Sequence, residues 1–420
     1  MSGRPPPERG PRLAAMALAA AFFCAPGFAD TDGIHGRLEL QDIGDFARGD
    51  SLDAALDLPD RNDASANLRL TWEPSWGPWN VSIHYLVAAQ YGDGVPLLRD
   101  EAGLLPAPPP TWFNLTDSFA DRGRLAAFNS IDRLSVGYTT PDFVVRVGRQ
   151  ALSWGSGLVF RPMDLFDPFS PTATDTEYKP GTDMLYTQFL FADGSDLQLI
   201  AVPRPAEKGA MPSSDASSFA LHYHASFFGH QTTMLLARDH GDWVGGLGLN
   251  GALGGATWNL ELVPSFVDRG ASRLSALANI SDAVTLFDRN ATLFAEYFHN
   301  GFGAANSDFA LASLPADLVG HLARGQLFNT RRNYLAAGMT LEVNPLLTVN
   351  PTLIAGLDDA SAYAILAATY SLSDNLMLVA GAQAPVGSSN TEFGGMPLVL
   401  GGKTFLAPTS QVYIQIRQYF

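Results

Sequence analysis

The sequence predicts an all-β protein, a transmembrane up-and-down antiparallel β-barrel of about 18 strands, with 16 as the other count that it allows. Three observations lead to this class. The chain opens with an export signal, no later stretch is apolar and uncharged over the roughly 18 residues that a spanning helix needs, and apolar and polar residues alternate in successive segments. Such a chain can cross a membrane only as a closed sheet, because lipid offers no partner to an unpaired strand edge.

Residues 1–29 have the three zones of a secretory signal peptide. Three arginines make a positive start, residues 13–25 form a short apolar core, and small residues precede Asp30, the expected first residue of the mature chain. Few residues then separate Asp30 from the first expected strand, so we expect no N-terminal plug domain and no energy-coupled receptor. The remaining residues, 30–420, are expected to form a single barrel domain.

Composition excludes several classes of function. The only cysteine, Cys24, lies in the signal, so the mature chain is expected to hold no disulfide and no cysteine metal site. The formal net charge is -16, and loss of the arginine-rich signal makes the mature chain more acidic still. Such a chain is not expected to bind nucleic acid.

The expected strands are segments in which apolar and polar side chains alternate with a period of two. In residues 131–140, for example, Leu134 and Val136 share one face, while Arg133 and Ser135 share the other. Glycine is frequent in residues 243–263, which weakens the register there and leaves 16 strands as an alternative. The expected strands are residues 34–43, 66–73, 79–90, 131–140, 143–150, 184–191, 196–202, 218–225, 230–239, 243–251, 256–263, 273–286, 291–300, 331–343, 346–356, 362–372, 376–384 and 411–420.

Connection lengths predict the topology. Connections after even-numbered strands are short, and most of those after odd-numbered strands are long, as in barrels with short periplasmic turns and long external loops. Both chain ends are then periplasmic. One long loop contains a short helix at residues 315–324, ended by Gly325. Aromatic residues near strand ends are expected at the level of the lipid headgroups rather than in the core of a soluble sandwich: Trp72, Trp79, Tyr138, Phe143, Phe191, Phe227, Trp243 and Phe287.

The last strand carries a targeting pattern. Val412, Ile414 and Ile416 share a face that we assign to lipid, and the chain ends in Phe420. This pattern resembles the assembly signal of Gram-negative outer-membrane barrels, although Gln418 stands where an apolar residue is usual. The resemblance implies the outer membrane as location and the barrel-assembly machinery, outer-membrane lipids and lipopolysaccharide as partners.

The polar faces of the strands should line the lumen. Inside an acidic barrel, arginines create a local positive field that can speed anions through a pore. The other interpretation, which we favour slightly, is that they pair with carboxylates and brace the wall. The expected pore-lining residues are Arg133, Ser135, Arg146, Gln188, His222, His224, Gln415 and Arg417.

The stretch around residues 148–169 resembles an uncharacterised family of Gram-negative porin-like outer-membrane proteins. The residues that carry this resemblance are Gly148-Arg149-Gln150, Ser153-Trp154-Gly155 and Asp164-Leu165-Phe166-Asp167-Pro168-Phe169, together with residues 131–138, 390–395 and the last strand. The resemblance implies the barrel fold and the membrane, and it allows a homotrimer. It does not specify the cargo.

By position, residues 151–183 are the third external loop, which in porins folds inward and narrows the channel. We expect the same here, against the alternative of an external, solvated loop. The charged residues at the constriction would then be Arg161, Asp164, Asp167, Asp175, Glu177 and Lys179. Their carboxylates could also bind calcium, but the spacing matches no compact calcium loop.

No motif for chemistry accompanies this pattern. His222 and His224 share a strand face and could bind zinc, but zinc needs further ligands that the sequence does not supply. No G-x-S-x-G nucleophile motif is present. We therefore expect neither an enzyme nor a metal or cofactor.

The function that the sequence favours is a passive outer-membrane channel for small charged or polar solutes, filtered by the third loop. The alternative is a conduit for hydrophobic molecules or lipids, because the third loop is unusually apolar for a filter. The residues that suggest this alternative are Leu158, Val159, Phe160, Leu165, Phe166 and Phe169. An enzyme or binding protein on a closed barrel is the third and least favoured function.

Overall fold

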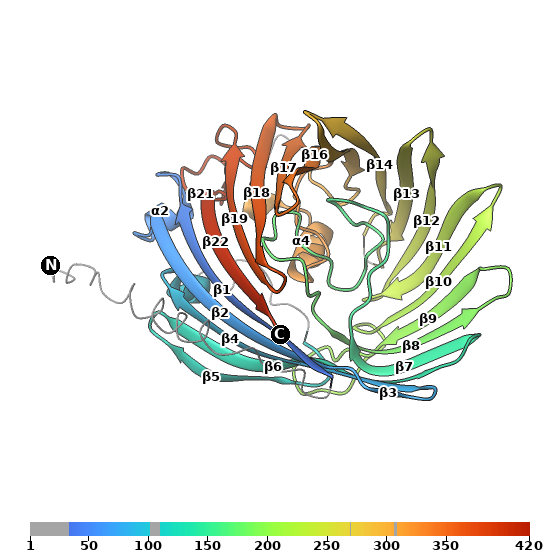
Figure 1. Ribbon diagram of the computed structural model, residues 1–420. Helices are drawn as coiled ribbons and strands as arrows, with labels where there is room; N and C mark the ends of the chain where they lie inside the picture. Colours follow the sequence, from blue (N-terminus) through green and yellow to red (C-terminus); the bar gives the residue numbers. More distant parts are fainter. Residues whose placement is uncertain (1–32, 101–109, 269, 306–308) are drawn as a thin grey trace.

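The computed structural model describes residues 33–100, 110–268, 270–305 and 309–420. They form a closed antiparallel barrel of 18 strands, in which each strand pairs with its neighbours in the chain and the last strand pairs with the first. Figure 1 shows the ring of strands. The predicted fold class and the count of 18 are confirmed, whereas the predicted signal peptide lies outside the described residues.

The barrel strands are β1 (Ile34–Phe46), β2 (Asp60–Trp72), β4 (Trp79–Gly92), β6 (Leu125–Thr139), β7 (Phe143–Gln150), β8 (Thr182–Leu190), β9 (Asp196–Val202), β10 (Ser218–Phe227), β11 (His230–Asp239), β12 (Asp242–Leu253), β13 (Ala256–Phe266), β14 (Arg273–Leu286), β15 (Arg289–His299), β16 (Asn333–Asn344), β17 (Leu347–Gly356), β18 (Ser361–Ser373), β19 (Leu376–Val386) and β22 (Ser410–Tyr419). The glycine-rich β12 and β13 pair with each other, which explains why the count is 18 rather than 16.

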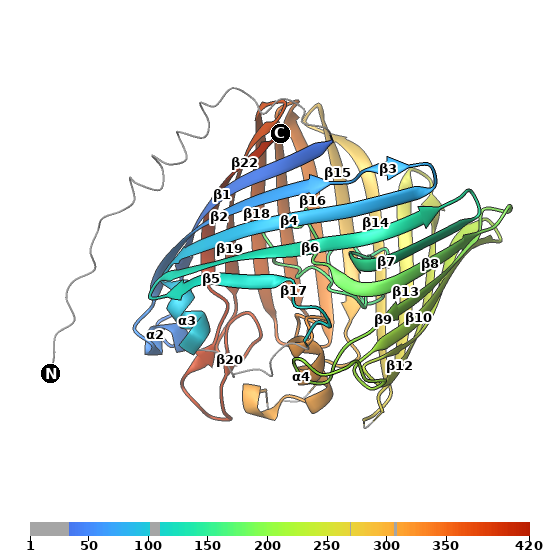
Figure 2. The same ribbon diagram turned by 90° about the horizontal axis from the view of Figure 1, so that it is seen from below.

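The remaining elements lie in the connections. They are α2 (Leu52–Ala55), β3 (Ser75–Trp76), α3 (Gly94–Asp100), β5 (Thr116–Arg122), the 3-10 helix η1 (Leu311–Ser313), α4 (Ala316–Ala323), β20 (Met396–Pro397) and β21 (Phe405–Leu406). Figure 2 shows α2, α3, α4 and β20 at the end of the barrel opposite the C-terminus. The helix expected at residues 315–324 is therefore α4. None of the helices in the described ranges is long and apolar enough to cross a membrane.

Alternation places apolar side chains on the outer face of the barrel, and on the last strand it places polar ones inside. On β22, Val412 and Ile414 are about half exposed on the outer face, whereas Gln415 between β1 and β19 is fully buried. Closure of the ring involves the last residue, because Phe420 exchanges two backbone hydrogen bonds with Gly36, of 2.7 and 3.0 Å. The Phe420 ring lies over Gly36, where a Cβ would come within 2.3 Å of it.

Two strands begin six residues earlier than the sequence predicts. β2 starts at Asp60 and β6 at Leu125, in segments that the sequence assigns to loops. The added residues continue the ladder, as in the pairs Phe46–Asp60 and Leu125–Tyr91. The added residues of β2 are mostly polar on both faces and those of β6 begin with four apolar residues, so neither segment alternates, while the backbone pairing continues.

The inner wall has two kinds of surface. From β8 to β13 it carries an apolar patch, with Met184, Ile200, Leu235 and Val263 in one buried cluster, beside a few polar residues such as His222 and Glu261. On β22, β1 and β2 it is polar, and Gln41 faces Ser65 while Glu39 faces Asn67 across β1 and β2. The loop described next contacts both surfaces.

Candidate functional site

The connection between β7 and β8, residues 151–181, is called loop three here. In Figure 1 it runs inside the ring of strands. Its first half is bound by two glutamates of the inner wall. The backbone N–H of Ser156 donates to Glu261 on β13, and those of Leu158, Val159 and Phe160 donate to Glu296 on β15, at 2.6, 2.9 and 2.8 Å.

The glutamate that receives these bonds is itself fixed. Glu296 is 1% exposed and also accepts a hydrogen bond of 2.9 Å from the Asn279 side chain on β14. The same amide of Asn279 donates to the carbonyl of Ser156 at 3.0 Å. A carboxylate that receives several donors in a buried site holds them firmly, since charge-assisted hydrogen bonds are about twice as strong as neutral ones.

Apolar side chains of loop three pack on the apolar wall. Trp154, Leu165 and Phe166 belong to the buried cluster of β8–β13. Phe160 stacks on Phe298 of β15 at 4.7 Å, in a second buried cluster. Three of the residues that suggest a hydrophobic entrance, Phe160, Leu165 and Phe166, are therefore buried in packing, whereas Leu158 is 43% exposed.

The second half of loop three is polar and contacts the polar wall. Arg37 of β1 forms ion pairs of 2.8 Å with both Asp175 and Glu177, and Arg417 of β22 lies 3.4 Å from Asp175. Burial alone would raise the pKa of Asp175, but its hydrogen bonds and the two arginine charges lower it overall. Tyr178 lies between two guanidinium groups, 4.8 Å from that of Arg37 and 4.3 Å from that of Arg69.

The two halves are joined by a buried ion pair. The Lys179 ammonium donates to both oxygens of Asp164 at 2.7 Å and also to the carbonyl of Leu152. Burial raises the pKa of Asp164 and lowers that of Lys179, each shift being opposed by the partner's charge. These two residues, expected at the constriction, are thus paired with each other.

The other two residues expected at the constriction have local contacts. Asp167 accepts a hydrogen bond from the Thr182 hydroxyl. The guanidinium group of Arg161 lies 5.8 Å from the centre of the Phe169 ring. Arg149, which the strand pattern assigns to the lipid face, is buried and pairs with Asp183 at 2.8 Å. The pairing of β7 with β8 continues through this position without a shift, and Phe113 contacts the pair: its carbonyl accepts from Arg149 at 2.6 Å and its N–H donates to Asp183 at 3.1 Å.

Four of the expected pore-lining residues lie together on β7–β10. The Arg146 guanidinium group lies 4.6 Å from the Tyr186 ring, whose hydroxyl donates to Gln188 at 2.9 Å. Gln188 donates in turn to Asp196 at 3.1 Å, and His224 is 3.5 Å from the same carboxylate. His222 stacks on Trp154 of loop three at 4.8 Å.

The expected arginines differ in their pairing. Arg417 pairs with Glu39 at 2.8 Å, and Arg133 donates to the backbone carbonyls of Asp132 and Lys179. Among the described residues Arg146 forms no ion pair. Arg417 thus has the contacts of a brace, whereas Arg146 keeps a charge that no carboxylate neutralises. Ser135 and Gln415 are buried on the inner face.

Sequence reasoning missed the residues that hold loop three: Arg37, Glu261, Asn279 and Glu296. A signal for the glutamates does exist. Each is a lone charge within an otherwise mostly apolar strand, in the sequences ATWNLELVPSF and RNATLFAEYFH. A charge at such a position needs a buried partner. No group of three or more potential metal ligands is found in the part of the chain that the structure describes.

Comparisons with known proteins identify the fold. No protein-family model and no curated protein matches the chain. Solved structures do match: Acinetobacter baumannii OccAB2 with a TM-score of 0.54 and 11% identity, over 93% of this chain and 98% of that one. A BenF-like porin from Pseudomonas fluorescens Pf-5 matches with 0.52 and 12%, over 94% and 100%. Pseudomonas aeruginosa OpdK with vanillate matches with 0.50 and 12%, over 92% and 98%.

At these identities the likeness establishes the fold, which is that of Gram-negative outer-membrane porins. The sequence-based expectation of a porin-like outer-membrane barrel is confirmed at this level. The apolar outer face of the closed barrel places the chain in the outer membrane.

Proposed function

We propose that the protein is a passive outer-membrane channel for small polar or charged solutes and that loop three is its filter. The observation that carries this proposal is the attachment of loop three to inner-face residues on both kinds of wall. Glu296 holds one half of the loop, and Arg37 holds the other. A loop fixed in this way within the lumen would leave solutes a narrowed passage.

The chemistry of the inner wall supports polar cargo. On β22, β1 and β2 the inward side chains carry amides, hydroxyls and charges, including Gln41, Asn67 and Arg417. Solutes that give up water in a narrow passage need such groups as replacement partners. The likeness to porins agrees with a channel, and one of these structures, that of OpdK, was solved with vanillate, a small carboxylate.

Conduction of hydrophobic molecules is not favoured. It would need an exposed apolar path, and the aromatic and aliphatic residues of loop three are mostly occupied in packing on the wall. We propose a channel rather than an enzyme. We further propose that Phe420 acts as part of the assembly signal for the barrel-assembly machinery, that lipopolysaccharide contacts the outer rim, and that a homotrimer is the assembly to test.

Single-channel recording in a planar bilayer tests the proposal. Purified, detergent-folded protein should give steady openings, and a salt gradient should reveal a preference for anions or cations. Heat modifiability on SDS gels should show that the sample is folded. Absence of conductance from demonstrably folded protein would contradict the channel function and would revive the conduit for hydrophobic molecules.

A further inference from the structure

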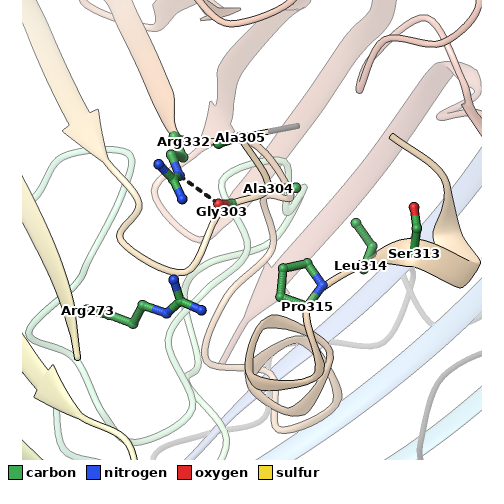
Figure 3. Close-up of a pocket in the computed structure, with 8 residues that line it drawn as sticks. All are labelled: Arg273, Gly303, Ala304, Ala305, Ser313, Leu314, Pro315 and Arg332. Atoms are coloured by element: carbon green, nitrogen blue, oxygen red, sulfur yellow. Dashed lines mark hydrogen bonds between the residues drawn. The ribbon is translucent and has the colours of Figure 1, made fainter. Parts of the chain in front are cut away.

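A small pocket lies at the loop end of the barrel, apart from loop three. Its volume is about 200 Å³. It is bounded by the start of β14, by the connection between β15 and β16 and by the residue before β16. Figure 3 shows the lining residues: Arg273, Gly303, Ala304, Ala305, Ser313, Leu314, Pro315 and Arg332. In Figure 3 the guanidinium group of Arg332 lies beside Gly303, and that of Arg273 extends toward Pro315.

The two arginines leave hydrogen-bond donors unused. Arg273 places two nitrogens, Nε and Nη2, on one oxygen of Asp317, each at 2.7 Å, so that its Nη1 is left over. The side chain of Arg332 donates through Nε to the carbonyl of Gly303 at 2.9 Å, and its terminal nitrogens make no hydrogen bond to any described residue. Because Asp317 neutralises one of the two charges, the group of three carries a single net positive charge.

The pocket belongs to the interior of the mouth rather than to the lipid side. Arg273 alternates with Leu274, which is 50% exposed on the outer face, and shares the inward position of Ser275, which is 5% exposed. Arg332 likewise shares the inward position of Tyr334, which is fully buried, while Leu335 is 44% exposed outside. A ligand of the pocket would therefore come from the aqueous mouth and not from the membrane.

We infer that this pocket binds one oxyanion group, a carboxylate or a phosphate, of a small free solute. Arginine matches planar oxyanions through paired N–H donors, and the unused donors and the net positive charge both favour an anion. The volume lies below the roughly 300–1,000 Å³ of sites for drug-sized ligands, which limits the solute to a small one. Binding at this pocket does not depend on the proposed channel function, whereas passage of the bound solute through the barrel rests on it.

Isothermal titration calorimetry of folded protein in detergent tests the inference with benzoate and with inorganic phosphate as probes. Wild-type protein should bind at least one probe at a single saturable site. Arg332→Gln should weaken this binding by about tenfold or more, because a charge-assisted pair is lost. Arg273→Gln should act in the same direction. The matched control is Arg324→Gln, which removes the same charge from the far end of α4, where Arg324 contacts Gly320 and His321.

Three results would overturn the inference. These are no saturable binding of either probe, binding that survives both pocket variants, and equal weakening by Arg324→Gln. A third measurement uses lipopolysaccharide as the ligand. If the protein binds lipopolysaccharide through Arg332 but binds neither free anion, the pocket holds a lipid phosphate and the inference of a free solute is refuted. Calorimetry does not depend on ion conduction. If the folded barrel binds a probe but conducts no ions, the proposed channel function is refuted and the proposed binding site is not.

Discussion

Replacing Glu296 with glutamine should detach loop three from the wall formed by β14 and β15. The glutamine retains one acceptor oxygen but turns an N–H₂ donor toward amides that also donate. At least one of the three loop amides then loses its partner, which costs about 1–3 kcal/mol when buried. The remaining bonds lose the charge that roughly doubles their strength.

Together these losses weaken the attachment by about 2–5 kcal/mol. Each 1.36 kcal/mol is a factor of ten, so the population of the detached segment rises by roughly 30-fold to several-thousandfold. The loss is local, since the apolar packing of Phe166 and the ion pairs of Arg37 are untouched. We therefore expect a folded barrel with a loosened filter rather than a misfolded protein.

Two measurements follow this change. Hydrogen exchange of the amides of residues 158–160 should accelerate, and single-channel records should show more open-state noise and a larger mean conductance. The matched control is Glu342→Gln on β16, where the exposed carboxylate accepts a bond of 3.0 Å from Asn290 in the neighbouring strand. Unchanged exchange and unchanged noise in Glu296→Gln would refute the idea that this carboxylate holds the filter.

Three further predictions use separate features. Gly157→Ala should reproduce the noise of the glutamate variant, because a Cβ at this position would lie 1.6 Å from the carbonyl oxygen of Phe160; a quiet channel would contradict this. Arg146→Glu should shift the reversal potential in a salt gradient toward cations, and Arg289→Glu, in a periplasmic turn, should not. Burial raises the pKa of Glu392, in the loop between β19 and β22, to about 7. This folded-state pKa exceeds the unfolded one, so the stability it contributes is present at low pH and is lost as the pH rises through about 7. Proteolysis of the external loops should accelerate as the pH rises from about 5 to about 7 and level off above that, and Glu392→Gln should abolish that dependence.

The sequence predicts the barrel well because its signal is repeated in every strand. The alternation of Leu134 and Val136 with Arg133 and Ser135 is typical, and the structure shows the apolar pair outside and the polar pair buried. Strand ends were harder to predict. Above the membrane both faces meet water, so residues such as those at 60–65 pair as a strand without alternating.

The site could be predicted only in part, because its contacts join residues far apart in the chain. Position and resemblance direct attention to residues 151–183, but they do not show that Glu296 receives the amides of Leu158 to Phe160. Nor does the sequence distinguish an arginine that pairs with a carboxylate of the wall from one that has no such partner. Arg417 and Arg146 have the same strand parity, and only the cross-strand neighbours, Glu39 in one case and Tyr186 in the other, distinguish them.

The two kinds of inner wall explain why loop three carries an apolar run and a charged run side by side. Residues 154–166 meet the wall of β8–β13, where burial of Trp154 and Phe166 stabilises the loop and the Trp154 indole N–H donates to Gln198 at 2.9 Å. Residues 172–179 meet the polar wall, where Asp175 and Glu177 face arginines. If the runs were exchanged, carboxylates would be buried against aliphatic side chains without partners, at a cost of several kcal/mol each. The apolar run is therefore an anchor, and a solute that follows the proposed route would meet the charged run instead.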